Sequence, residues 1–215
     1  MSSKSLIDIA YTKIRQKIIL GDFMPGTLLS ENELANELNM SRTPIRTAIS
    51  HLESEGFVVS LKNRGILVKE ISVKEMLDMI EVMSSFQMHA LDSFNERGCS
   101  IDISELEKYL NKQIEASRLD NYPEYIRYSN LFGRYIISSL NNQAMLQIMD
   151  SYHDKTSMFA TINWKRTPHQ PHYSANLVNG SVYQAMASND YVGAKQIVKE
   201  TLLNYRNRLV TEGRM

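Results

Sequence analysis

The first seventy residues carry short apolar stripes separated by turn signals, a pattern typical of a small mixed domain. Apolar residues at helical spacing predict three helices, over residues 5–20, 31–38 and 41 to about 55. Two apolar runs follow, at residues 57–61 and 66–68, and the Lys-Asn-Arg-Gly sequence between them predicts a hairpin. The order of these elements predicts a winged helix-turn-helix.

The rest of the chain has the periodicity of helices throughout. Ser72 and Glu75 have the spacing of a capping box, which marks the start of a long helix that ends near Gly98. Further helices are predicted over about residues 104–119, 122–140, 143–161, 173–187 and 190–209. We therefore expect a mainly α protein with two domains. They are a winged helix-turn-helix over residues 1–70 and an antiparallel bundle of about six helices over residues 71–215.

Composition narrows the function classes. The chain has 215 residues, with 24 Lys and Arg against 24 Asp and Glu, which excludes a polybasic tail and an acidic disordered chain. A single cysteine, Cys99, excludes an intrachain disulfide and a zinc finger built on cysteines. Neither a signal sequence nor an apolar run of membrane-spanning length is evident, so we expect a cytoplasmic protein with no membrane partner.

The start of the third predicted helix carries the chemistry of nucleic-acid recognition. Arg42 and Arg46 are four residues apart and project from one helix face, where each can bind a guanine edge or a phosphate. The hydroxyls of Ser41 and Thr43 stand at a helix N-terminus, which favours a phosphate. The sequence between Leu38 and Leu52 contains no acidic residue that would repel DNA.

The predicted hairpin adds a basic tip. Lys62 and Arg64 stand at its turn, and Gly65 allows close approach of the backbone to a groove. A solvated arginine pair on an ordinary helical hairpin would explain the arginines alone. The ordered set of two helices, a tight turn, an arginine-bearing helix and a basic hairpin favours DNA binding instead.

This ordered set resembles the N-terminal domain of the GntR family of bacterial transcription regulators. The matching positions are Ile18, Gly21, residues 25–26, 29–35 and 41–46, Ala48, Leu52, residues 55–57 and residues 63–65. The helical remainder resembles the effector-binding FCD domain of the FadR subfamily. A position in the preceding helix that is often Arg in the family is Asn32 here. Together, the local chemistry and the resemblance predict these DNA-binding residues: Asn32, Ser41, Arg42, Thr43, Pro44, Arg46, Lys62, Arg64 and Gly65.

The FCD resemblance implies a divalent metal in many members, held by one Asp and three His. The aligned positions in this chain are Ser129, Gly133, Asn179 and Thr201, none of which is a usual metal ligand. We therefore expect a bundle with no metal site and no cofactor. The alternative is a relocated site at His153, His169 and His172, against which surface or hydrogen-bonded histidines are favoured.

Polar and aromatic residues within the apolar stripes of the bundle predict where a small ligand would bind. The candidate ligand-binding residues are Met83, Tyr128, Arg134, Asn179 and Tyr205. Arg134 could bind a carboxylate or a phosphate. Met83 stands where the family often has Arg, so an apolar ligand such as an acyl chain is a second hypothesis.

The function predicted from these features is that of a sequence-specific transcription regulator, most often a repressor. It would act as a homodimer on a palindromic double-stranded DNA operator and respond to a small-molecule effector through the link near residues 69–73. One alternative is a regulator whose bundle only dimerises. Another is an enzyme using Asp150, His153 and Asp154, which is disfavoured because the chain has no known catalytic motif, and a solvated helix face explains the cluster.

Overall fold

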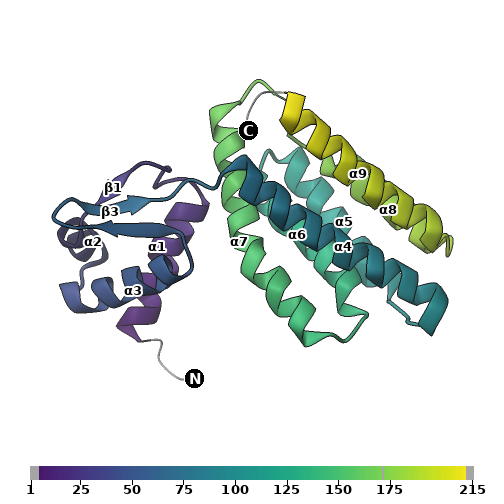
Figure 1. The fold of residues 1–215 in the computed structure, drawn as a ribbon, viewed down its shortest axis with the longest axis horizontal. Helices are drawn as coiled ribbons and strands as arrows, with labels where there is room; N and C mark the ends of the chain where they lie inside the picture. The colour runs from purple at the N-terminus through teal and green to yellow at the C-terminus, as the bar shows by residue number, and fades with distance from the viewer. Residues whose placement is uncertain (1–4, 171, 212–215) are drawn as a thin grey trace.

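The computed structural model describes residues 5–170 and 172–211, and it divides into an N-terminal domain and a helical bundle (Figure 1). The N-terminal elements are α1 (Leu6–Ile19), β1 (Leu28–Leu29), α2 (Glu31–Leu38), α3 (Arg42–Ser54), β2 (Val58–Leu61) and β3 (Gly65–Val68). The bundle elements are α4 (Val73–Arg97), α5 (Ile103–Arg118), α6 (Tyr122–Ser138), α7 (Gln143–Arg166), α8 (Ala175–Ala187) and α9 (Tyr191–Thr211). The predicted fold class, a winged helix-turn-helix followed by a helical bundle, is confirmed.

The caps of the N-terminal helices follow from their sequence. The Ser5 side chain accepts a hydrogen bond from the backbone of Asp8, whose carboxylate accepts in return, and this capping box starts α1. Ser30 accepts from the backbone of Glu33 and starts α2. Asn39 adopts a left-handed conformation at the end of α2, which turns the chain sharply into α3.

A three-stranded antiparallel sheet in the order β1-β3-β2 forms the wing. The predicted hairpin is present, with Leu61 opposite Gly65 and Val58 opposite Val68. The sequence gives no warning of β1, which pairs Leu28 with Leu67. A strand of two residues is too short to display alternation, so no periodic pattern could reveal it.

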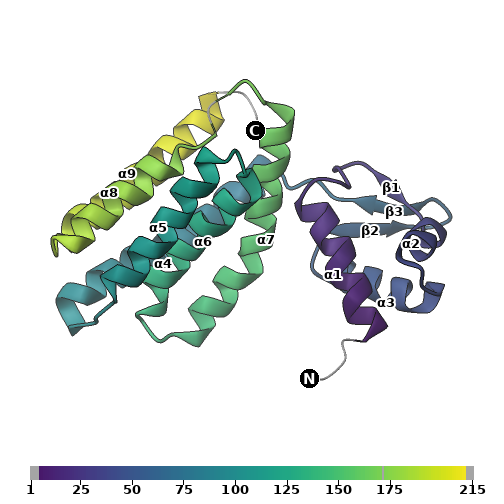
Figure 2. The same ribbon diagram turned by 180° about the vertical axis from the view of Figure 1, so that it is seen from behind.

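The bundle is built from neighbouring helices that run side by side, α5 against α6 and α8 against α9 (Figure 2). The predicted capping box of Ser72 and Glu75 starts α4. Ala90, Leu91 and Phe132 belong to the core between these helices. No helix within residues 5–170 and 172–211 is long and apolar enough to cross a membrane.

Helix α7 connects the two domains and is longer than its sequence predicted. It continues to Arg166 instead of ending near Thr161, since the first helix-breaking residue is Pro168. The added turn carries Ile162, which is buried with Met158 in the core of the N-terminal domain. In Figure 2, α7 lies beside α1. The bundle therefore contributes side chains to the core of the other domain.

Candidate nucleic-acid interface and ligand cavity

The first turn of α3 presents its polar groups to solvent. Ser41 is the N-cap residue, but its side chain makes no capping hydrogen bond. Arg42, Thr43 and Arg46 are exposed, whereas the side chain of Pro44 is buried. Because no side chain caps this turn, its hydroxyls and main-chain N–H groups remain available for a phosphate. Because the Pro44 side chain is buried, it offers no surface for contact with DNA.

Glu31 of α2 holds both exposed arginines. Its Oε1 accepts a hydrogen bond from Nε of Arg46 at 3.1 Å, and its Oε2 accepts from Nη2 of Arg46 and of Arg42, each at 3.0 Å. The side chain of Arg42 keeps 58% of its surface exposed and that of Arg46 keeps 66%, so the ion pairs leave part of each guanidinium accessible. The hydrogen bonds from Arg46 and then Arg42 hold the pKa of the Glu31 carboxyl below its ordinary value.

This pairing qualifies the expectation that nothing acidic faces the recognition helix. The segment between Leu38 and Leu52 has no acidic residue, as the sequence shows, but the fold brings Glu31 to it from the preceding helix. Glu31 lies 11 and 15 positions before the two arginines, so spacing along a single helix could not reveal the contact. Glu31 is a functional candidate that sequence reasoning missed.

The wing tip extends from the end of the hairpin formed by β2 and β3. Lys62 and Arg64 are both exposed there, and Asn32 is exposed on α2. Gly65 has a φ of +102°, and a Cβ at this position would lie 2.8 Å from the carbonyl oxygen of Leu29. The fold itself requires this glycine, because β1 passes beside it; the sequence suggested only an approach to a DNA groove.

A cavity of about 290 Å³ lies in the bundle, lined by α4, α6, α7, α8 and α9. The four positions aligned with family metal ligands all line it: Ser129, Gly133, Asn179 and Thr201. These residues offer two hydroxyls and one amide, whereas transition metals in proteins take imidazole, thiolate and carboxylate. The residues of this cavity do not fit the family metal.

The structure brings together some of the predicted ligand-binding residues and separates others. Three of them line the bundle cavity: Met83, Asn179 and Tyr205. Arg134 does not line it, because Nε and Nη2 donate to the two carboxylate oxygens of Asp150, at 2.6 and 2.9 Å. Tyr128 also lies outside the lining, with the guanidinium of Arg127 over its ring at 4.2 Å. Four polar lining residues were not predicted from the sequence, because polar positions on a helix or at its cap usually face solvent: Ser84, Gln87, Asn130 and Ser174.

The histidines and acids of the disfavoured alternatives occupy other roles. His169 is exposed, and Nε2 of His172 lies 2.7 Å from the main-chain oxygen of Thr167. Nε2 of His153 is buried and has no hydrogen-bond partner among the described residues, and burial lowers the pKa of this histidine. Within the described ranges, no three His, Cys, Asp or Glu side chains gather where they could hold a metal ion.

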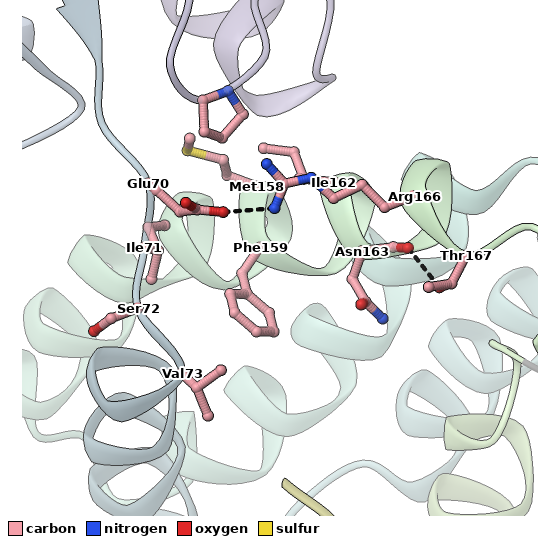
Figure 3. Close-up of a pocket in the computed structure, with 11 residues that line it drawn as sticks. Glu70, Ile71, Ser72, Val73, Met158, Phe159, Ile162, Asn163, Arg166 and Thr167 are labelled. Atoms are coloured by element: carbon pink, nitrogen blue, oxygen red, sulfur yellow. Dashed lines mark hydrogen bonds and ion pairs between the residues drawn. The ribbon is translucent and has the colours of Figure 1, made fainter. Parts of the chain in front are cut away.

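A larger cavity, of about 490 Å³, lies where the two domains meet. It is bounded by the linker at residues 70–73 and by α7, with Phe159 and Ile162 on its apolar side (Figure 3). Across this junction Nη1 of Arg166 lies 2.5 Å from Oε1 of Glu70. This ion pair joins the linker to α7 beside the cavity.

Comparison with known families decides what this arrangement belongs to. Residues 6–68 match the family described as "Bacterial regulatory proteins, gntR family", and residues 78–204 match the FCD domain. The chain belongs to the GntR family. It is a GntR transcription regulator with a FadR-type FCD domain, and its domains are those of regulators, not of enzymes.

Curated relatives and solved structures agree with this assignment. The GntR chain is 26% identical over 152 residues to the Nta operon transcriptional regulator of Aminobacter aminovorans, covering 70% of this chain and 72% of the relative. It is 32% identical over 142 residues to the gluconate operon transcriptional repressor of Bacillus licheniformis, covering 65% and 57% respectively. A GntR regulator from Rhodococcus sp. RHA1 shares the fold with a TM-score of 0.81, at 20% identity, over 97% of this chain and 99% of that one. Escherichia coli McbR/YncC shares it with a TM-score of 0.74, at 18% identity, over 98% and 99%.

Proposed function

We propose that this GntR regulator binds a palindromic operator as a homodimer, represses transcription there, and is modulated by a small molecule in the bundle cavity. The observation that carries the DNA part is the exposed arginine pair on α3, held in one orientation by Glu31. Arginines with fixed guanidinium planes suit bidentate contacts to guanine. The first turn of α3 and the wing tip, with Arg64, add phosphate and groove contacts.

Two copies of the chain are needed because one copy offers little general attraction to DNA. Residues 1–70 hold nine Lys and Arg against eight Asp and Glu, so the domain is almost neutral. Binding that depends on counterion release is weak when few phosphates are neutralised. A two-fold dimer on an inverted repeat doubles the specific contacts and compensates for the missing charge.

Helix α7 offers a route from the bundle cavity to the DNA-binding domain. Met149 lines the bundle cavity from α7, and Ile162, further along the same helix, is buried in the N-terminal core. A ligand that favours one position of α7 would therefore change how the N-terminal domain is held. This route adds to the linker at residues 69–73, which the sequence alone suggested.

Selection of bound duplexes from a random pool by the full chain tests the DNA part. We expect enriched sequences with two inverted half-sites. Their centres should be separated by about 10 base pairs, which is one helical turn, or by a multiple of that distance. Sedimentation of the complex should give two chains per duplex. Enrichment of a single half-site bound by one chain would contradict the dimer.

The second candidate function is that of a regulator whose bundle only dimerises. The cavity side chains favour it because they do not fit the family metal. Mobility shifts of the selected duplex, with and without a ligand that stabilises the protein, separate the two. A changed affinity supports modulation. Unchanged affinity with a ligand that demonstrably occupies the bundle favours the second candidate.

A further inference from the structure

The bundle cavity has polar side chains but no charge among the residues that line it. Its polar groups include those of Ser129 and Asn130 of α6, Asn179 of α8 and Thr201 of α9. The apolar lining includes Met83, together with other residues of α4, α6, α7, α8 and α9. None of the described lining residues is Asp, Glu, Lys, Arg or His. A charged ligand buried here would have no counter-charge, and an unpaired buried charge costs far more than a hydrogen-bonded neutral group.

A chain of hydrogen bonds behind the cavity runs in one direction. The hydroxyl of Ser117 donates to the main-chain oxygen of Ile114 at 2.7 Å, so its Oγ accepts from Nδ2 of Asn176 at 2.8 Å. Oδ1 of Asn176 then accepts from Nε2 of Gln113 at 3.0 Å. Oε1 of Gln113 in turn accepts from Nδ2 of Asn179 at 2.8 Å. Because the chain starts at a backbone carbonyl, which can only accept, the orientation of every amide in it is set.

This direction determines what Asn179 presents to the cavity. Its Nδ2 donates one hydrogen to Gln113 and the other to Oγ of Ser129, at 3.2 Å. Its Oδ1 accepts no hydrogen bond from the described residues, so it is left as an acceptor. Ser129 already accepts from Asn179, and no described residue takes its hydroxyl hydrogen, so it is left as a donor. Gln113 has no exposed surface, so a flipped amide would leave buried groups unpaired.

We infer that the effector is an uncharged small molecule that donates a hydrogen bond to Oδ1 of Asn179 and accepts one from Oγ of Ser129. A carboxamide or an alcohol has both functions, and its apolar part packs against Met83. A carboxylate has only acceptors and would meet the Oδ1 of Asn179 with like partial charge. An ammonium could donate to Oδ1 but would find no counter-charge. This inference rests on the proposed modulation by a ligand in the bundle and names the class of that ligand.

Arg134 was the predicted ligand-binding cation, and a place in the cavity would have reversed this conclusion. It follows Gly133, which lines the cavity, but its guanidinium is held by both oxygens of Asp150. The pair lowers the pKa of the Asp150 carboxyl through its hydrogen bonds with Arg134, so both groups stay ionised and bound to each other at neutral pH. Arg134 therefore does not supply the charge that a bound carboxylate would need.

Matched probes of different charge test the inference on the full chain. Straight-chain primary amides are compared with the carboxylates and amines of the same carbon skeletons, by thermal shift and by calorimetric titration. We expect the melting temperature to rise with increasing amide concentration and to stay unchanged with the carboxylates and amines. Addition of a divalent-metal chelator should not alter the amide binding.

Two serine variants of α6 tie the binding to this cavity. Ser129→Ala removes the donor and should weaken amide binding on the order of tenfold. Ser138→Ala is the control: this hydroxyl donates to the main chain of Tyr135, does not line the cavity, and its removal should leave amide binding unchanged. The melting temperature of each variant without probe verifies that it folds. Equal weakening in both variants would overturn the assignment.

The outcomes separate this inference from the function on which it rests. Carboxylates that bind as tightly as the amides, or more tightly, would overturn the uncharged class and leave ligand modulation standing. If no probe of any charge binds, the ligand role of the cavity fails and the inference with it. Operator binding by the chain without ligand is unaffected by either result, so it reports on the DNA part alone.

Discussion

Nε of Arg46 lies 3.1 Å from Oε1 of Glu31, and Nη2 of the same arginine lies 3.0 Å from Oε2. The carboxylate fixes the plane of the guanidinium and also cancels part of its charge. An orienting anion of this kind favours specific over general DNA binding, because it restricts the geometry of the arginine while reducing its attraction to any phosphate.

Glu31→Gln should therefore raise affinity for random duplex and lower discrimination between operator and random duplex by on the order of tenfold. The dependence of binding on salt should become steeper, since one negative charge is lost at the interface. Glu33→Gln is the matched control on the same helix. Its backbone N–H donates to Oγ of Ser30, and no described residue forms a hydrogen bond or ion pair with its carboxylate. Discrimination that is unchanged in Glu31→Gln would refute the orienting role.

The wing should contribute affinity more than sequence preference. Arg64→Ala removes an exposed cation at the hairpin tip and should weaken binding to operator and random duplex by similar factors. The slope of log affinity against log salt should fall by about 1, as expected for the loss of one phosphate contact. Fluorescence titrations at several salt concentrations measure this. A loss confined to the operator would instead assign base recognition to Arg64.

The docking of α7 in the N-terminal core predicts a difference between two isoleucines of that helix. Ile162 is 5% exposed, so Ile162→Ala should cost about 2–5 kcal/mol of unfolding free energy. Ile148 on the same helix is 39% exposed, and Ile148→Ala should change it by less than about 0.5 kcal/mol. Denaturant titration gives both values. Similar losses of unfolding free energy in Ile162→Ala and Ile148→Ala would contradict the shared core. We also expect calorimetry of Ile162→Ala to show the two domains unfolding in separate transitions.

The half-buried His153 predicts a loss of stability in mild acid. Burial lowers its pKa below the ordinary 6.5, against the opposing effects of Asp150, Asp154 and the backbone of Asn130, while Arg134 adds to the lowering. The unfolded chain therefore binds the proton more readily than the folded one. The contribution of His153 to stability is complete above about pH 6.5 and is lost as pH falls from there towards the lower folded pKa. Melting temperatures measured across this range should fall less steeply for His153→Gln, and an identical slope would rule out this histidine as the cause.

The sequence predicts most of the fold because the elements carry local signals. The capping box of Ser72 and Glu75 marked the start of α4, and periodic apolar positions marked the other helices. It could not predict β1, which exists only because Leu28 pairs with Leu67 from the wing. It also could not predict how far α7 extends, because Ile162 is held by contacts with the other domain.

The site was predictable where it lies on one helix and unpredictable where it joins several. Arg42 and Arg46 follow from helical spacing, whereas Glu31 reaches them from a different helix. Alignment placed Ser129 and Asn179 in one cavity, but it also suggested Arg134, which faces Asp150 instead. Spacing along one helix gives the face of a residue, and the partner on a neighbouring helix decides its role.

The most direct test of DNA reading by α3 is the affinity of Arg46→Ala for the selected operator and for a scrambled duplex at the same salt concentration. The account predicts that the operator complex is weakened by about 1–3 kcal/mol, while binding to the scrambled duplex changes much less. Preference at the base pair contacted by Arg46 should relax in a repeated selection. Unchanged affinity for the operator, or an equal loss on both duplexes, would contradict the assignment of α3 as the recognition helix.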